Sequence, residues 1–168
     1  MGYWDNIGDE VTEIIALAQL ETQYFDVNEV NNITLFIGIL RLSDCDATLL
    51  LHSFGLTYTL TRETAAHYFR GVDTPGIADR LKKAVLTLAS GMFGVPLAKT
   101  VNRTLEIANE QAQEGAVNVL PEHLVLSLLR QKEPEVMALL SRLSVDTKKL
   151  HEQVLTLVEK KAEYGQNH

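Results

Sequence analysis

The sequence has little of what cross-links a chain or interrupts a helix: 168 residues contain one cysteine and four prolines. Few prolines leave room for long helices, because proline removes a backbone donor and clashes with the preceding helical turn. A single cysteine cannot form an intramolecular disulfide, which excludes a disulfide scaffold. Cys45 lies in an apolar stretch, where we expect it to act as a small core residue.

Long hydrophobic runs are also missing. The longest strongly apolar run, residues 33–40, is far shorter than the roughly 20 residues that cross a bilayer. No basic start followed by an apolar stretch marks a secretory signal. We therefore expect a cytoplasmic protein that makes no membrane contact.

Positive charge is in deficit. The chain has 15 Lys and Arg residues against 22 Asp and Glu residues, for a formal net charge of -7. Such a balance repels the phosphate backbone instead of releasing its counterions. We therefore expect no nucleic-acid partner.

The motifs of the common enzyme classes are absent as well. The sequence has no phosphate-binding Gly-x-x-x-x-Gly-Lys-Ser/Thr loop, no Gly-x-Gly-x-x-Gly, no Gly-x-Ser-x-Gly and no His-Glu-x-x-His. Its five histidines are scattered, and no pair of cysteines could supply zinc thiolates. The sequence therefore predicts no enzyme activity, no cofactor and no metal site.

What the sequence does contain is an internal repeat. A shift of 89 positions places residues 35–41 on residues 124–130 and continues into the next segment without a gap. Further upstream, a shift of 90 relates residues 14–18 to residues 104–108. Both copies space apolar residues at i, i+3, i+4 and i+7, which is typical of one buried helical face. The sequence therefore predicts two copies of one helical motif.

Apolar spacing, caps and turns predict four helices in each copy and no strand. The predicted helices span 8–24, 31–41, 45–54 and 60–70 in the first copy, and 98–113, 121–130, 134–143 and the segment after residue 146 in the second. Ser43 and Asp46 resemble a capping pair for the third helix, and Asp146 is placed to cap the last. Four leucines hold matching core positions in the two third helices, so we expect them to be buried alike: Leu50, Leu51, Leu139 and Leu140.

The segment between the copies has no counterpart and is expected to be a connector with its own helix near 77–90. The predicted fold class is therefore all-α, with two tandem four-helix repeats related by pseudo-twofold symmetry and a helical connector. We expect one domain over residues 1–168. Its parts are repeat one at about 8–70, the connector at about 71–97 and repeat two at about 98–160.

Residues 120–130 carry a family resemblance. They read Leu-Pro-Glu-His-Leu-Val-Leu-Ser-Leu-Leu-Arg. This stretch resembles the second helix of the double Clp-N repeat, the N-terminal domain of Clp-type AAA+ unfoldases, which typically reads Thr-Glu-His-Leu-Leu-Leu-Gly-Leu before a basic residue. The turn at residues 143–146, Leu-Ser-Val-Asp, resembles the Leu-Gly-Val-Asp turn of that family. The duplication is also the family's arrangement, so the resemblance covers nearly all of both repeats.

The resemblance implies a non-catalytic module that binds protein substrates or adaptor proteins, with a Clp ATPase as a further partner. Some members of the family bind phosphorylated arginine through the Glu of the Thr-Glu-His motif in each repeat. In this sequence Glu122, followed by His123, matches that motif. The first repeat has Ile33 at the same place, and its side chain cannot accept a hydrogen bond from a guanidinium. The resemblance therefore implies one ligand site at most. A phosphate there would need donors of its own, either backbone N–H groups or a nearby base such as Lys99 or Arg103, to offset repulsion by Glu122.

Two alternatives stay open on the sequence. Glu122 could act only locally, as an exposed first-turn Glu that stabilises the helix start by about 0.3–1 kcal/mol, with His123 bonded to a backbone group. The whole chain could likewise be a stand-alone regulatory or scaffold protein that has kept the fold and lost the ligand site.

Overall fold

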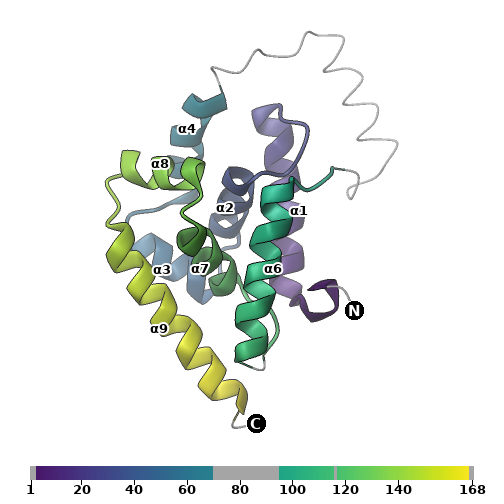
Figure 1. Cartoon of the computed structure of the whole chain (residues 1–168). Helices are drawn as coiled ribbons and strands as arrows, with labels where there is room; N and C mark the ends of the chain where they lie inside the picture. The colour runs from purple at the N-terminus through teal and green to yellow at the C-terminus, as the bar shows by residue number, and fades with distance from the viewer. Residues whose placement is uncertain (1–2, 70–94, 116, 167–168) are drawn as a thin grey trace.

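The structure is a computed structural model that describes residues 3–69, 95–115 and 117–166. Within these residues the fold is all-α, as the sequence predicts, and the only β-type pairing is two isolated bridges (Figure 1). The elements are η1 (Tyr3–Asn6), α1 (Asp9–Phe25), α2 (Asn32–Arg41), α3 (Asp46–Ser53), α4 (Tyr58–Phe69), α6 (Lys99–Glu114), α7 (Pro121–Gln131), α8 (Pro134–Arg142) and α9 (Thr147–Gln166). The helix expected near 77–90 lies outside the described residues.

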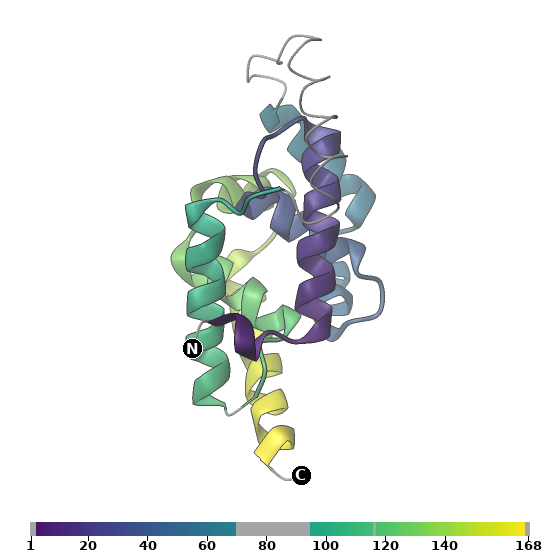
Figure 2. The ribbon, with the colours of Figure 1, turned by 90° about the vertical axis from the view of Figure 1, so that its right-hand side faces the viewer.

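The two repeats, α1–α4 and α6–α9, pack on each other reciprocally. Helix α2 contacts α8, and α3 contacts α7; in the same way α4 contacts α8, and α3 contacts α9. Exchanging the repeats turns each contact into its counterpart, which is the pattern of a pseudo-twofold axis. Helices α1 and α6 run in opposite directions along two sides of the molecule (Figure 2). The predicted arrangement of two tandem four-helix repeats is therefore confirmed.

Backbone hydrogen bonds join the repeats at two equivalent places. Val30, before α2, exchanges bonds of 2.8 and 2.9 Å with segment 96–98, which precedes α6. Val119, before α7, exchanges bonds of 2.8 and 3.2 Å with segment 6–8, which precedes α1. Each repeat therefore supplies the partner for the buried backbone groups at the start of the other repeat's second helix.

A glycine allows the close approach of α1 and α2. A Cβ atom at Gly38 would lie 2.8 Å from the carbonyl oxygen of Ile14 and 3.1 Å from the amide nitrogen of Ala18. The first distance is too short for any Cβ atom and its neighbour is backbone, and the second is tight, so glycine is favoured at this crossing. Arg41 follows Gly38 by about one helical turn, and the close packing therefore brings its side chain within reach of α1.

The core leucines confirm the predicted faces with one exception. Leu51, Leu139 and Leu140 are fully buried, but Leu50 is only partly buried. The expectation that all four are alike is therefore wrong. The packing around the two third helices also differs, since α9 packs against α8, whereas the corresponding packing of α4 on α3 is weaker.

The two predicted caps also have different outcomes. Asp146 caps α9, because its Oδ1 accepts the backbone N–H of Lys149 at 3.0 Å. The predicted Ser43–Asp46 capping pair is wrong, since the Ser43 hydroxyl donates to Asp44 at 3.3 Å and no side chain caps α3. Asp46 binds Lys161 of α9 at 2.6 Å instead, and this charge-assisted bond occupies its carboxylate.

Candidate functional site

The start of α7 holds both residues of the predicted ligand site. Pro121 occupies the first turn, where its missing N–H is not needed. Nδ1 of His123 accepts the backbone N–H of Leu120 at 3.0 Å, so this ring satisfies a donor that the helix start would otherwise leave free. Burial lowers the pKa of His123 to about 4, which keeps the imidazole neutral and able to accept. The backbone hydrogen bond expected for His123 is therefore confirmed.

Glu122 lies in the interior, not on the surface. Only 2% of the residue is exposed, because the first turn of α7 is enclosed where α7 packs against α3 and α9. Its Oε1 has no hydrogen-bond partner among the described residues. The expectation that Glu122 is an exposed first-turn residue is therefore wrong.

Burial is also the main influence on the charge of Glu122. It raises the pKa of this carboxyl above its ordinary value, and the nearby carboxylates of Asp46 and Glu10 raise it further. A hydrogen bond from the backbone N–H of Glu122 itself lowers this pKa, and Lys161 lowers it further, although the Lys161 ammonium is already bonded to Asp46. An ionised Glu122 is thus costly in this place, since a buried charge needs a full set of partners.

The two cations expected as phosphate partners lie at the surface of α6. Arg103 pairs with Glu106 of its own helix at 3.2 Å, and both side chains are exposed. Lys99 is exposed at the start of α6. The cation that acts on Glu122 is Lys161, from the far end of α9. It was missed because only the tertiary fold places it near α7.

The equivalent place in the first repeat is apolar. Ile33 takes the position of Glu122 and is 1% exposed. The helix start is completed by a capping box, in which Thr34 Oγ1 accepts the N–H of Asn31 and Asn31 Oδ1 accepts the N–H of Thr34, both at 3.0 Å. In both repeats the third residue of the second helix, Thr34 or His123, accepts a backbone N–H at the helix start. The residue before it is a buried carboxyl, Glu122, only in the second repeat.

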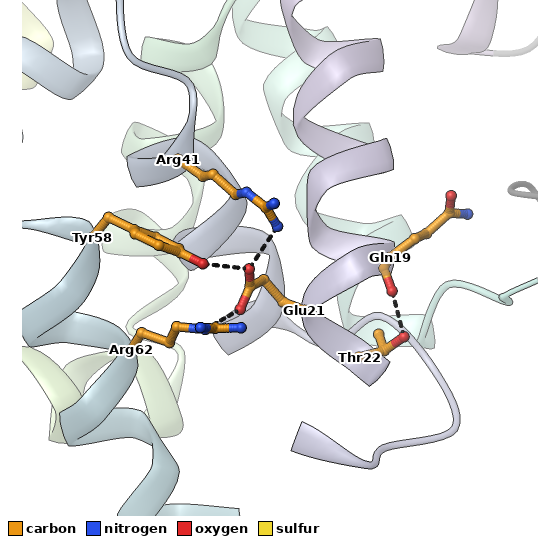
Figure 3. Close-up of polar contacts among 6 residues, drawn as sticks. All are labelled: Gln19, Glu21, Thr22, Arg41, Tyr58 and Arg62. Carbon is orange, nitrogen blue, oxygen red and sulfur yellow. Dashed lines mark hydrogen bonds and ion pairs between the residues drawn. The ribbon is translucent and has the colours of Figure 1, made fainter. Parts of the chain in front are cut away.

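A second buried carboxylate, Glu21 of α1, was missed by the sequence analysis. Its side chain is completely buried and is held by three donors from two other helices (Figure 3). Oε1 accepts from Arg41 Nη1 and from the Tyr58 hydroxyl, each at 2.9 Å, and Oε2 accepts from Arg62 Nε at 2.8 Å. This Glu21 cluster therefore satisfies a charge that would otherwise be very unfavourable in the interior.

Aromatic rings complete the Glu21 cluster. The Arg62 guanidinium lies 3.3 Å from the centroid of the Tyr24 ring, a cation–π contact. Burial and the hydrogen bond to Glu21 raise the pKa of Tyr58, so its hydroxyl keeps the proton that it donates. A sequence signal was available, since Glu21 falls on the same face of α1 as the core residues Ile14 and Ala18.

The remaining candidates carry no site. Cys45 is buried, and burial raises the pKa of its thiol, which favours the unreactive protonated form. The described residues contain no group of three or more side chains that could hold a metal ion. In the same part of the chain, no helix combines the length and the apolar character that crossing a membrane requires.

Comparisons with known proteins show which sequences and folds this chain is similar to. No family model matches the sequence. The chain is 22% identical over 158 residues to a probable ATP-dependent Clp protease ATP-binding subunit of Chlamydia pneumoniae. The aligned part covers 93% of this chain but only 17% of that relative, so the chain spans a small fraction of its length.

A solved structure matches over nearly the whole chain. The N-terminal domain of the caseinolytic-protease-associated chaperone ClpD from Arabidopsis thaliana superposes with a TM-score of 0.72 at 17% sequence identity. The match covers 92% of this chain and 99% of that domain. The fold predicted from the resemblance is therefore confirmed: this chain has the double-repeat fold of a Clp N-terminal domain.

Proposed function

We propose that this chain is a protein-binding module that delivers substrates or adaptor proteins to a Clp-type AAA+ unfoldase in the cytoplasm. The module is not catalytic by itself. The observation that carries the proposal is the match over 92% of the chain to the N-terminal domain of a protease-associated chaperone. The sequence supports it further, since it has no phosphate-binding loop with which to bind ATP.

The proposed ligand contact of the module is Glu122 in the second repeat, with His123 holding the start of α7 in place. Phosphoarginine is the ligand class that the resemblance implies. In support of this contact, the buried Oε1 of Glu122 lacks a donor, and a guanidinium would supply one. Because the side chain is buried, binding requires the first turn of α7 to open toward the ligand.

A second candidate function is a stand-alone regulatory or scaffold protein that has lost the ligand site. Two observations favour it. Ile33 removes the acceptor from the first repeat, and the closed packing around Glu122 hides the acceptor of the second.

Titration of the chain with free phosphoarginine, followed by amide chemical shifts, separates the two candidates. The binding module predicts shifts around Glu122 and none around Ile33. The Glu122→Ile variant, which copies the first repeat, should lose these shifts and keep the remainder of the spectrum. Absence of any shift in the parent chain would contradict the ligand contact and favour the scaffold.

Co-purification tests the partner. An affinity-tagged chain expressed in its native host should enrich a Clp ATPase or Clp protease subunit, measured by quantitative mass spectrometry against the tag alone. Equal amounts in both samples would count against delivery to an unfoldase.

A further inference from the structure

The donors that hold Glu21 in the first repeat have counterparts in the second. The shift of 89 positions relates Arg41 to Arg130, Tyr58 to Thr147, and Arg62 to His151. All three counterparts line one surface cavity of about 510 Å³, at the end of α7 and the start of α9.

We call it the α7–α9 cavity, and its remaining lining residues are Leu129, Lys132, Met137, Lys148 and Glu152.

No internal carboxylate takes the place of Glu21 in the second repeat. The shift of 90 that relates α1 to α6 places the neutral Gln111 at the position of Glu21. Gln111 is buried, both polar atoms of its amide lack a partner among the described residues, and it does not line the cavity. The second repeat therefore keeps a set of cavity-lining donors without the acceptor that joins them in the first.

The cations of the α7–α9 cavity are also free. Across the described ranges, no ion pair or side-chain hydrogen bond engages Arg130, Lys132 or Lys148. These three cations face one acidic lining residue, Glu152, in a chain whose formal net charge is -7. The cavity is thus a local positive region on an acidic protein, which attracts anions.

The inner wall of the cavity is apolar. Leu129 is buried, and Met137 is partly buried against the core. Such a wall suits the methylene groups of a side chain whose charged end meets the cations at the rim.

We infer that the α7–α9 cavity binds the carboxylate of a glutamate side chain from an acidic peptide segment of a partner protein. The bound carboxylate takes the role that Glu21 has in the first repeat. Arg130 offers the planar fork that matches a carboxylate, and Thr147 and His151 add single donors, as Tyr58 and Arg62 do for Glu21. The first repeat thus contains, as part of its own fold, the interaction that the second repeat makes with a partner.

The inference does not depend on the phosphoarginine contact. Glu122 and Arg130 lie at opposite ends of α7, and eight residues of helix separate them by about 12 Å. Amide shifts at the two ends can therefore be told apart, and either proposal can fail alone.

The test uses an acetylated and amidated tetraglutamate peptide, with tetraglutamine and inorganic phosphate as comparison probes. Tetraglutamate should shift the amides of Arg130, Thr147 and His151, and calorimetry should show saturable binding. Arg130→Gln should weaken this binding by about tenfold, the effect of losing one charge-assisted hydrogen bond. Lys160→Gln removes an equal charge from α9 outside the cavity and should leave the affinity within about twofold, because an exposed distant charge is screened.

Three results would overturn the inference. Equal weakening by Arg130→Gln and Lys160→Gln would show attraction to overall charge without a site. Equal binding of tetraglutamine would show that the carboxylate is not recognised. Tighter binding of inorganic phosphate than of tetraglutamate, with shifts at the same amides, would assign the cavity to phosphate.

Discussion

The two repeats of this chain share a backbone plan but bury their polar groups at opposite places. The first repeat buries Glu21 between α1, α2 and α4, where two arginines and a tyrosine hold it, and places Ile33 at the start of its second helix. The second repeat has neutral Gln111 in place of Glu21 and buries Glu122 at its second-helix start without a partner for Oε1.

This difference separates a structural acid from a candidate functional one. A fully bonded buried carboxylate such as Glu21 fixes the geometry of three helices. A buried carboxyl with an open acceptor, such as Glu122, costs stability without an evident structural return, which is typical of a group kept for a ligand. The comparison can be tested by exchanging or removing the polar groups of each repeat in turn.

The largest expected effect comes from removing both arginines of the Glu21 cluster. The double variant Arg41→Ala/Arg62→Ala leaves the carboxylate of Glu21 buried with only Tyr58 as a donor. We expect a loss of about 3–5 kcal/mol in the free energy of unfolding, because an uncompensated charge remains in the interior. Urea denaturation of the double variant and the parent chain measures this loss in the free energy of unfolding. Arg130→Ala, at the position equivalent to Arg41, is the matched control and should change stability by no more than about 0.5 kcal/mol.

The core leucines provide the second test. Leu139→Ala should cost about 2–5 kcal/mol, since it opens a cavity at a fully buried position. The equivalent variant Leu50→Ala should cost clearly less, because Leu50 is already partly exposed. Thermal and urea unfolding of the two variants check this difference. Equal losses would mean that the partial exposure of Leu50 does not reduce its contribution to stability.

The third test uses pH. The pKa of His123 is about 4 in the folded chain, below the ordinary value of 6.5, so the unfolded state binds the proton more tightly. The contribution of His123 to the free energy of unfolding is therefore fully present above about pH 6.5. As the pH falls toward 4, protonation of the unfolded state reduces this free energy by up to about 3 kcal/mol. Urea midpoints between pH 7 and pH 4.5 measure the loss.

The control for this pH effect copies the first repeat. His123→Thr places at the start of α7 the residue type that accepts the equivalent bond in α2. The variant should lose less stability over the same pH range. An unchanged pH profile would show that another group takes up the proton.

The smallest expected effect is a gain in stability, from substitution of Glu122. Because burial raises its folded-state pKa, this residue opposes folding increasingly as the pH rises above its ordinary value of 4.5. Glu122→Ile should therefore raise the free energy of unfolding at pH 7 by about 1–3 kcal/mol, through removal of an unsatisfied buried group. The near-isosteric Glu122→Gln should show part of the same gain, and the gain from Gln should shrink below pH 4.5. A loss of stability in both variants would mean that Glu122 has a structural partner.

Much of the fold could be predicted because it depends on local patterns. The repeat shift and the apolar spacing located the helices outside the connector to within two residues of their observed bounds, apart from the C-terminal ends of α4 and α9, which adjoin residues outside the described ranges. The Asp146 cap and the backbone bond of His123 were also predictable, since both partners of each bond lie within three residues. Such interactions are set by helical geometry and need no tertiary information.

The failures concern groups whose partners are distant in the chain. Asp46 was assigned to a local cap, but Lys161 of α9 binds it. Glu122 was taken as exposed because a first-turn Glu usually is, whereas the packing of α7 on α3 and α9 encloses it. Glu21 received no role, since its donors are 20 to 41 positions away.

The sequence by itself determined the helices, their duplication and the absence of the common catalytic motifs, because periodicity, caps and spacing act over a few residues. Only the tertiary structure decided which carboxyl groups are buried and which cations reach them. Burial and charge pairing depend on the distances between helices. Those distances are fixed only when the repeats pack around their pseudo-twofold axis, so no local sequence pattern encodes them.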